Sequence, residues 1–205
     1  MSATPLETSV HRQVRADFDG ESVVVYQAYP PAIADAALAA GTFVAPFKRE
    51  RMTWIKPSFL WMMYRCGWAG KEGQERVLAV RIRRSGFEWA LRHASLSHYD
   101  SAVHDDHGSW REQKDASPVR VQWDPERSLR LEPRTERSIQ IGLSGVAVQR
   151  YVDEWITDLR DVTALAHRVH GHVRNGDLDA ARAQLPSESV YPLPGDIGAR
   201  LGATY

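Results

Sequence analysis

Residues 21–43 read ESVVVYQAYPPAIADAALAAGTF, and this stretch decides the fold class. The β-branched, apolar run 21–29 is typical of a core strand, and the two prolines after it predict a turn. Pro31 can open a helix, because the N–H that proline lacks would have no partner in the first turn. Alanine and leucine then recur at helical spacing up to Gly41, which predicts a helix over 31–40. A strand followed directly by a helix indicates a fold that combines both.

The same alternation of strands and helices continues downstream. ERMTWIKP is predicted to be a strand that ends at Pro57, and Ser58 is a suitable N-cap for a short buried helix in SFLWMMYRCGW. A further strand is predicted over 76–83. It precedes a helix over 86–94 whose apolar residues fall on one face.

The second half of the chain begins with a polar segment and ends in helices. SHYDSAVHDDHGSW predicts a long loop before PVRVQWDPE, a strand that alternates apolar and polar residues up to a predicted turn at Asp124-Pro125. SLRLEP is the predicted pairing partner of this strand. Residues 137–145 predict another strand, and residues 146–185 are typical of two or three helices that break near Asn175-Gly176. The last segment, 186–205, is rich in proline and glycine and predicts an ordered coil or an extension that faces a partner.

These patterns predict one α+β domain over residues 11–185, in which helices flank a compact mixed or antiparallel sheet. The sheet core is expected over 11–145 and a C-terminal helical segment over 146–185. Residues 1–10 are expected to be a flexible N-terminus, and residues 186–205 a Pro/Gly-rich tail. A chain of 205 residues is long enough for one hydrophobic core.

Composition limits where the protein acts and what it binds. The 26 basic and 26 acidic residues give a formal net charge of zero, so any recognition of anions must be local. A single cysteine, Cys66, cannot form an internal disulfide, and the first residues lack the features of a signal peptide. The apolar stretches fall far short of the roughly 20 residues that span a bilayer. We expect a cytoplasmic protein with no membrane partner, and the oligomeric state stays open.

The best candidate for local recognition is residues 46–68, PFKRERMTWIKPSFLWMMYRCGW, which contain five cationic and six aromatic residues. Cationic side chains and the N–H groups of a helix start can bind phosphate together. Trp54 lies among these cations and can stack on a base or a nicotinamide ring. A solvated charged face explains the cations about equally well. The four cations that precede the predicted helix are Lys48, Arg49, Arg51 and Lys56.

Histidines gather in the predicted loop. His98, His104 and His107 lie among aspartates, but their spacing matches no standard zinc pattern and the sequence has no second cysteine. We therefore expect no metal. Only histidine has an unperturbed pKa near neutrality, so His98 is a candidate acid or base if the loop folds over the proposed pocket.

Several familiar catalytic motifs are absent from the sequence. It contains no G-x-S-x-G elbow, no G-x-x-x-x-G-K-[ST] loop, no G-x-G-x-x-G after the first strand and no H-E-x-x-H. Hydrolases with a nucleophile elbow, P-loop enzymes and Rossmann enzymes therefore lose support.

Five long segments carry a family resemblance: RQVRADFDGESVVVYQAY, FVAPFKRERMTWIKPSFLWMMYRCGW, QERVLAVRI, PVRVQWDPER and SIQIGLSG. They resemble a family of bacterial and fungal proteins known as domain of unknown function 4291. The resemblance covers about residues 11 to 172. It implies no established activity.

A second and more remote resemblance is to compact ADP-ribosyltransferase-like domains. It rests on the order of Tyr26-Gln27-Ala28 on the first strand, then IADAALAAGTF, Thr53 in RMTWIKPS, the segments FLWMMYR and RVLAVRI, and Gln140 in SIQIGL. Gln27 stands where such enzymes usually have His or Arg, and Gln140 stands where many have Glu. The resemblance implies that Gln140 stabilises an oxocarbenium-like centre or orients the acceptor.

This second resemblance implies an ADP-ribosyltransferase-like fold that binds NAD or another phosphorylated nucleotide and transfers ADP-ribose to a nucleic acid or a small molecule. In that arrangement Tyr26 and Trp54 flank the nicotinamide, and Gln27 contacts its ribose. Thr53 and Ser58 hydrogen-bond the sugar. The pyrophosphate or an acceptor phosphate is held by Lys48, Arg49, Arg51 and Lys56.

Two other interpretations stay open. In one, the protein is a non-enzymatic RNA- or single-stranded DNA-binding module in which residues 46–68 stack bases and pair phosphates. Its affinity would fall steeply with salt and would not depend on NAD. In the other, the same cations and tryptophans anchor a protein partner. A concave basic pocket favours the nucleotide, an open basic groove the nucleic acid, and a flat Trp/Arg patch the protein.

Overall fold

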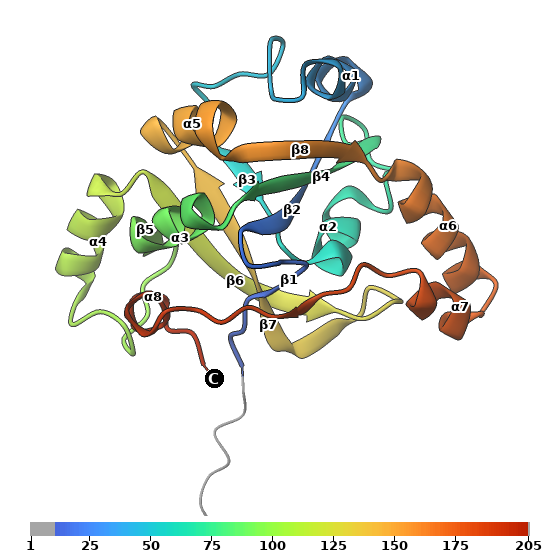
Figure 1. Ribbon diagram of the computed structural model, residues 1–205. Helices are drawn as coiled ribbons and strands as arrows, with labels where there is room; N and C mark the ends of the chain where they lie inside the picture. Colours follow the sequence, from blue (N-terminus) through green and yellow to red (C-terminus); the bar gives the residue numbers. More distant parts are fainter. Residues whose placement is uncertain (1–10, 205) are drawn as a thin grey trace, which may run out of the picture.

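Two β-sheets form the centre of the protein (Figure 1). The structure is a computed structural model that describes residues 11–204, so the flexible N-terminus expected over 1–10 lies outside the described residues. One sheet has three antiparallel strands in the order β2-β4-β8. Their bounds are Ser22–Tyr29, Arg76–Arg83 and Ile156–Asp161.

The second sheet has four strands in the order β3-β7-β6-β5. Its neighbouring strands are antiparallel except β5 and β6, which run parallel. The predicted α+β class with antiparallel and mixed sheets is therefore confirmed. The strands are β3 (Thr53–Ile55), β7 (Pro133–Leu143), β6 (Val119–Arg127) and β5 (Ala94–Leu96).

The two sheets meet where the middle of β2 approaches the end of β3. An isolated antiparallel bridge joins Tyr26 to Lys56. The Tyr26 N–H donates to the Lys56 carbonyl at 2.7 Å, and the Lys56 N–H donates to the Tyr26 carbonyl at 3.2 Å. This pair of bonds fixes the backbone position of Lys56.

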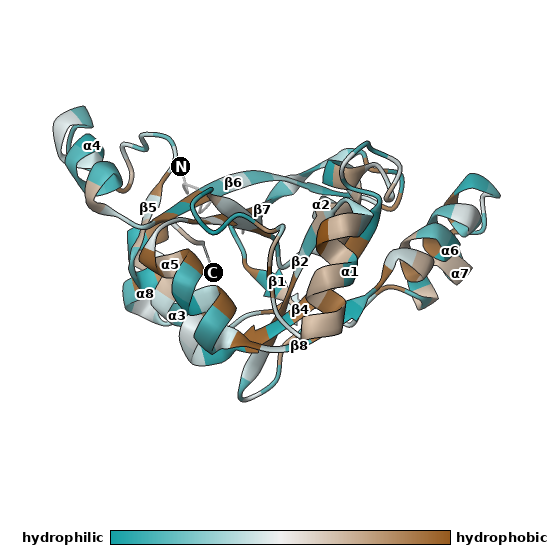
Figure 2. Cartoon of the chain, turned by 90° about the horizontal axis from the view of Figure 1, so that it is seen from above, coloured by the Kyte–Doolittle hydropathy of each residue, from teal (hydrophilic) through white to brown (hydrophobic). Residues whose placement is uncertain are grey.

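Helices flank both sheets, and Figure 2 shows α4 at one end of the molecule and α6 with α7 at the other. Pro31 opens α1 as predicted, and Gly41 follows its last residue with a left-handed φ of 71°. Ser58 caps α2, because its Oγ accepts the Trp61 N–H at 3.2 Å. The helices are α1 (Pro31–Ala40), α2 (Phe59–Cys66), α3 (Arg84–Arg92), α4 (His107–Ala116), α5 (Val146–Arg150), α6 (Thr163–Arg174), α7 (Leu178–Ala183) and α8 (Gly195–Leu201).

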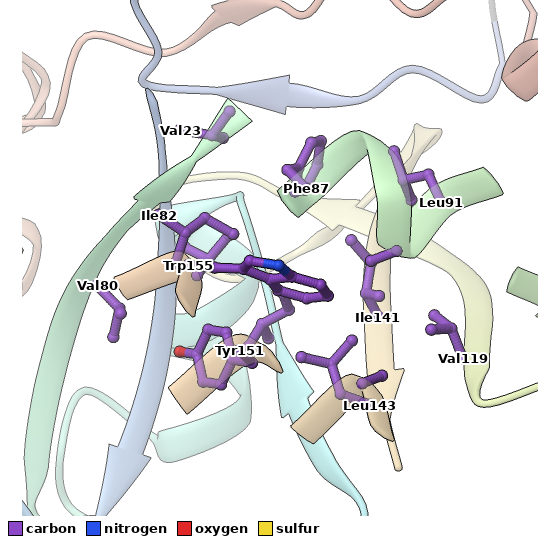
Figure 3. Packing of buried hydrophobic residues seen from close by; sticks show 14 of the residues in the cluster. Val23, Val80, Ile82, Phe87, Leu91, Val119, Ile141, Leu143, Tyr151 and Trp155 are labelled. Carbon is purple, nitrogen blue, oxygen red and sulfur yellow. The ribbon is translucent and has the colours of Figure 1, made fainter. Parts of the chain in front are cut away.

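The larger hydrophobic core includes Trp155, which is 3% exposed, in the last turn of a π-helix (η1, Tyr151–Trp155) that continues α5. Figure 3 shows its indole between Ile82 of β4 and Ile141 of β7. Gly86 of α3 allows this close packing, since a Cβ there would lie 2.4 Å from Cγ of Trp155. The core therefore ties both sheets to α3.

Residues 107–116 were expected to be part of a loop but form α4. Asp106 caps this helix, accepting the N–H groups of Gly108 and Ser109 at 2.5 and 2.9 Å. No α4 side chain is buried, so the sequence has no apolar periodicity that would have revealed the helix.

Two strand predictions also need correction. Residues 156–161 were assigned to a helix but form β8, which pairs antiparallel with β4. They follow α5 and the π-helix directly. The helical pattern of 146–155 therefore gave no sign that a strand begins at residue 156. The predicted partner of β6, SLRLEP, supplies instead the connection after β6, and pairing resumes at Pro133.

The segment expected to be a coil or a partner-facing extension contributes to the fold. Ser189–Val190 form β9, which pairs antiparallel with β1 (Arg15–Ala16), and α8 follows. The Thr204 N–H donates to the carbonyl of Arg12 at 2.9 Å. Four apolar side chains of this segment are buried in the larger core: Tyr191, Leu193, Ile197 and Leu201.

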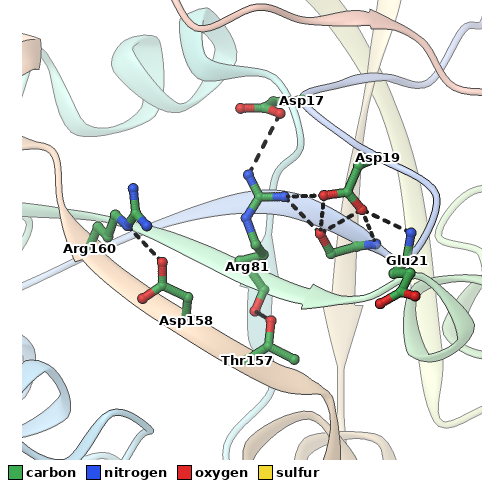
Figure 4. A network of polar contacts seen from close by, with 8 residues as sticks. Asp17, Asp19, Glu21, Arg81, Thr157, Asp158 and Arg160 are labelled. Atoms are coloured by element: carbon green, nitrogen blue, oxygen red, sulfur yellow. Dashed lines mark hydrogen bonds and ion pairs between the residues drawn. The ribbon is translucent and has the colours of Figure 1, made fainter.

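A group of paired charges lies on the three-stranded sheet, and we call it the Arg81 network (Asp17, Asp19, Ser22 and Arg81; Figure 4). The Arg81 guanidinium donates to Asp19 Oδ2 at 3.2 Å and to Ser22 Oγ at 2.7 Å. It also lies 3.8 Å from Asp17 Oδ1. The network connects the segment before β2 to the middle of β4.

None of the helices formed by residues 11–204 has the length and apolar character that crossing a bilayer requires.

Candidate functional site

Two cavities share a wall near the junction of the sheets. The first, the Thr53 cavity, has a volume of about 400 Å³ and is lined by β2, α2 and the segment 46–56. The second, the Asp124 cavity, has a volume of about 510 Å³ and is lined by α2, β6 and β7. Trp54, Lys56 and Arg65 line both cavities.

Four cations line the Thr53 cavity, and no aspartate or glutamate lines it. None of the four forms an ion pair with an acidic side chain of residues 11–204. Their neighbour Arg49 differs, because it lies outside both cavities and pairs with Asp153 at 2.8 Å. Unneutralised cations around a concave surface attract anions. The four are Lys48, Arg51, Lys56 and Arg65.

Lys56 is the most buried of these cations, with 6% of its surface exposed. Its Nζ donates to the carbonyl of Trp54 at 3.3 Å. Burial, followed by the like charge of Arg65, lowers the pKa of Lys56 to about 7, while Asp124 acts in the opposite direction. Near neutral pH a large fraction of this side chain is therefore a neutral amine.

A closed hydrogen-bond network underlies the Thr53 cavity. Gln27 Nε2 donates to Thr53 Oγ1 at 2.6 Å and to Tyr29 Oη at 2.8 Å, and Gln27 Oε1 accepts from Tyr151 Oη at 2.7 Å. Tyr29 Oη and Thr53 Oγ1 lie 2.8 Å apart. Both amide hydrogens of Gln27 are used and 2% of its surface is exposed, so this side chain holds Thr53 in place.

A carboxylate held by two amides lies in the second cavity. Asp124 Oδ1 accepts from Gln122 Nε2 at 2.9 Å, and Asp124 Oδ2 accepts from Gln140 Nε2 at 2.7 Å. Gln122 and Gln140 are directly opposite each other on β6 and β7. Of this group the sequence predicted only Gln140, because Asp124-Pro125 was interpreted as a turn. The signal for Asp124 was the two-residue period that places it on the same face as Gln122.

A cation covers an aromatic pair beside this carboxylate. The rings of Trp61 and Tyr64 stack at 5.1 Å, and Cζ of Arg127 lies 3.5 Å from the centre of the Tyr64 ring. All three residues line the Asp124 cavity. The sequence predicted that Trp61 and Tyr64 are core residues, which is correct for Trp61 at 4% exposed and wrong for Tyr64 at 37% exposed. It gave no role to Arg127, which comes from a strand far along the chain.

The structure brings seven of the predicted site residues to the two cavities. Gln27, Thr53, Lys48 and Arg51 line the first, and Gln140 lines the second. The other two line both cavities: Trp54 and Lys56.

The remaining predicted site residues line neither of the two cavities. Tyr26 is 2% exposed within a smaller apolar cluster, and burial raises its pKa. Ser58 Oγ donates to Glu126 Oε1 at 3.0 Å. Arg49 is paired on the surface. His98 is exposed after β5, which forms the edge of its sheet opposite to β3.

The loop after β5 uses its charged and ring side chains within the fold. His107 stacks on Tyr99 with ring centres 3.8 Å apart, and Asp100 pairs with Arg12 at 2.6 Å. In the described part of the chain, no three His, Cys, Asp or Glu side chains are grouped in a way that could hold a metal ion.

A family profile described as "Domain of unknown function (DUF4291)" matches residues 13–191. The match includes both sheets and every residue that lines the two cavities. No curated protein and no solved structure is significantly similar to the chain.

Proposed function

We propose that this chain, which belongs to the DUF4291 family, binds a phosphorylated nucleotide of the NAD type in the Thr53 cavity. One observation carries the proposal: Lys48, Arg51 and Arg65, together with the partly neutral Lys56, line this cavity without an acidic partner among residues 11–204. A nucleotide phosphate would supply the negative charge that these side chains lack, and it would accept charge-assisted hydrogen bonds from them.

The dimensions of the cavities support a ligand with an aromatic group as well as phosphates. A volume of about 400 Å³ is within the usual range for small-molecule sites, roughly 300–1,000 Å³. Lys48 and Arg51 would hold the phosphates, and the half-buried Trp54 ring would stack on a base or nicotinamide. A dinucleotide would extend past Lys56 into the adjoining Asp124 cavity.

A finer proposal concerns the fold and the reaction. An ADP-ribosyltransferase-like fold is supported by the order of Tyr26-Gln27, Thr53 and Gln140 along the chain. Transfer of ADP-ribose to a nucleic acid or small molecule would need a group that stabilises positive charge developing on the ribose. Asp124 is such a group, and Gln140 would act as its positioning residue through the 2.7 Å hydrogen bond. We expect Asp124→Asn to abolish transfer and to change NAD affinity little.

The direct test is a thermal-shift and calorimetric titration with NAD, ATP, ADP-ribose and a short single-stranded RNA, at low and moderate salt. A ligand that binds the native state stabilises it by mass action. Selective stabilisation by NAD or ADP-ribose would support the proposal. Stabilisation by RNA alone, lost when salt is added, would instead identify a nucleic-acid-binding module.

Two neighbouring arginines provide a matched pair of variants. Arg51→Ala removes a cavity cation, and we expect nucleotide affinity to fall at least about tenfold, since a hydrogen bond to a charged group contributes roughly 1.5–3 kcal/mol. Arg49→Ala removes a cation already paired with Asp153, and we expect no change in affinity. Equal losses for the two variants would show that general surface charge, and not the cavity, attracts the ligand.

A further inference from the structure

The chain contains only four lysines, and one of them differs from the rest in environment. Lys48 and Lys71 are exposed and Lys114 is partly exposed, whereas Lys56 is buried. Lys71 Nζ donates to the carbonyl of Arg65 at 2.8 Å, and Lys114 Nζ lies 4.5 Å from the ring of Trp110. Lys56 is the one of the four that lines both cavities.

The surroundings of Lys56 match what a nucleophilic amine needs. Its Nζ has no carboxylate within ion-pair distance in the described part of the chain, so no salt bridge holds the proton on the nitrogen. Lys48 and Arg51 line the same cavity and can bind a phosphate of the molecule that carries the electrophile. The bridge to Tyr26 fixes the backbone from which the side chain extends.

We propose that Lys56 is a nucleophile that forms an imine with the carbonyl carbon of a phosphorylated aldehyde or ketone bound in the Thr53 cavity. This inference rests on the phosphate-binding property of the cavity given under the proposed function, and it goes beyond nucleotide binding to a covalent step.

The covalent step balances without an oxidant or a reductant. The lone pair of the neutral Lys56 amine forms a bond to the carbonyl carbon, and the π electrons of the C=O bond move to oxygen. A proton passes from nitrogen to that oxygen to give a carbinolamine. Loss of the hydroxyl with a second proton from nitrogen releases water and leaves the C=N bond.

The charges around Lys56 keep much of the amine neutral near pH 7. Arg65 on α2 lowers the pKa of Lys56, in addition to the larger effect of burial, while Asp124 on β6 and Cys66 on α2 raise it. An exposed lysine has a pKa near about 10.4 and reacts slowly at neutral pH. We therefore expect Lys56 to react at a lower pH than the other three lysines.

Pyridoxal 5′-phosphate tests the inference, because it joins an aldehyde, a phosphate and an aromatic ring. The full chain would be incubated with this probe, reduced with borohydride to fix any imine, and digested for peptide mapping by mass spectrometry. We expect Lys56 to be modified first, with inorganic phosphate and ATP slowing the modification. Modification of the exposed lysines with Lys56 left unmodified would overturn the inference.

Three controls separate reactivity from general exposure. Unphosphorylated pyridoxal should modify Lys56 at least tenfold more slowly, and equal rates would refute the role of the phosphate. Lys56→Met should lose the modification and retain a cooperative unfolding transition. Lys48→Arg keeps the cavity charge, so it should still be modified at Lys56. Loss of modification at Lys56 in a folded Lys48→Arg protein would overturn the role of Lys56 as the nucleophile of this site, because its reaction would then depend on the Lys48 amine and not only on the cavity charge.

Calorimetry separates failure of this inference from failure of the proposed function. If NAD or inorganic phosphate binds and Lys56 is still not modified, the nucleophilic role is wrong and the phosphate site stands. If Lys56 is modified by the phosphorylated probe in preference to pyridoxal while nucleotides do not bind, the covalent site stands and the nucleotide proposal falls.

Discussion

The Arg81 network and the wall of the Thr53 cavity both contain cationic side chains, yet the partners of these side chains differ. Arg81 has two aspartates and a serine hydroxyl around its guanidinium. The cavity cations have no acidic partner among residues 11–204, although acidic and basic residues are equal in number in the chain. Paired charges stabilise the contacts between strands, whereas unpaired buried cations lower stability and attract an external anion. The difference identifies which cations belong to a site.

The largest effect on stability should come from removing the buried cation. Lys56→Met replaces it with an apolar side chain of similar length, and we expect the unfolding free energy at neutral or lower pH to rise by about 3 kcal/mol. The folded pKa of Lys56, about 7, lies below the unfolded value of 10.5. The wild-type protein should therefore gain stability relative to the variant as pH rises from 7 to 10.5.

Urea unfolding of both proteins at about pH 6 and about pH 9 measures this difference. Lys71→Met is the matched control, because it removes an exposed lysine from the same region. If the difference in stability between the wild-type protein and Lys56→Met does not change with pH, the Lys56 ammonium is well solvated. Lys56 would then cost the fold no stability, and it would not differ from the paired Arg81 in this respect.

Glu188 tests whether a buried carboxylate, like the buried cation of Lys56, lowers the stability of the fold when it is charged. Glu188 accepts the Phe59 N–H at 2.7 Å, where α2 begins. Burial, with a smaller effect of nearby Glu126, raises the pKa of Glu188 from 4.5 to about 8. The folded state therefore holds this proton more tightly than the unfolded state. Its contribution to stability is greatest below pH 4.5 and is lost as pH rises to about 8.

We expect Glu188→Gln to remove that decline, because glutamine can still accept the Phe59 N–H and never ionises. The variant should be more stable than the wild-type protein by about 2 kcal/mol above pH 8 and similar to it near pH 4. This value is reduced because Glu188 is partly exposed and solvent screens its charge. Thermal unfolding across this pH range measures the difference. Parallel curves for the two proteins would contradict the raised pKa.

Breaking the paired network should have a smaller effect of opposite sign. Arg81→Met leaves Asp17 and Asp19 without their shared cation, and we expect only a small fall in the unfolding free energy, because Asp19 is exposed and solvent screens its charge. Nucleotide affinity should not change. A loss of nucleotide affinity in calorimetric titration would show that the Arg81 network contributes to the binding site, and the proposed difference between the two regions would be wrong.

The smallest effect should come from the exposed pair. Arg49 and Asp153 are 43% and 53% exposed, and such pairs contribute at most about 1 kcal/mol to stability. We expect Arg49→Ala to change the unfolding free energy by less than about 0.5 kcal/mol in urea unfolding. A larger loss would show that this pair holds the segment 46–56 against the π-helix.

The fold was predictable where the signals are local. The strand that includes Tyr26 and the helix between Pro31 and Gly41 are as predicted, because apolar runs and helix-terminal residues act within a few positions. The strand β8 and the helix α4 were missed for the reasons given above: one continues a helical pattern, and the other buries no side chain.

The site was predictable to the same extent. Lys48, Arg51, Trp54 and Lys56 are close in sequence, so their charge and ring content could be recognised as one group. The Asp124 cavity joins α2 to strands some sixty to eighty residues further along the chain, and only the pairing of β6 with β7 brings its polar side chains together. No local pattern contains that information.

The late segment that includes β9 and α8 has a consequence for how the protein is made. Tyr191, Ile197 and Leu201 fill the same core as strands from the first quarter of the chain. During translation that core stays incomplete until residue 201 has left the ribosome. Because synthesis adds roughly 5–20 residues per second, the early apolar strands are made well before the residues that complete their packing. The apolar faces of the early strands therefore have no complete core to pack into until the late segment is available.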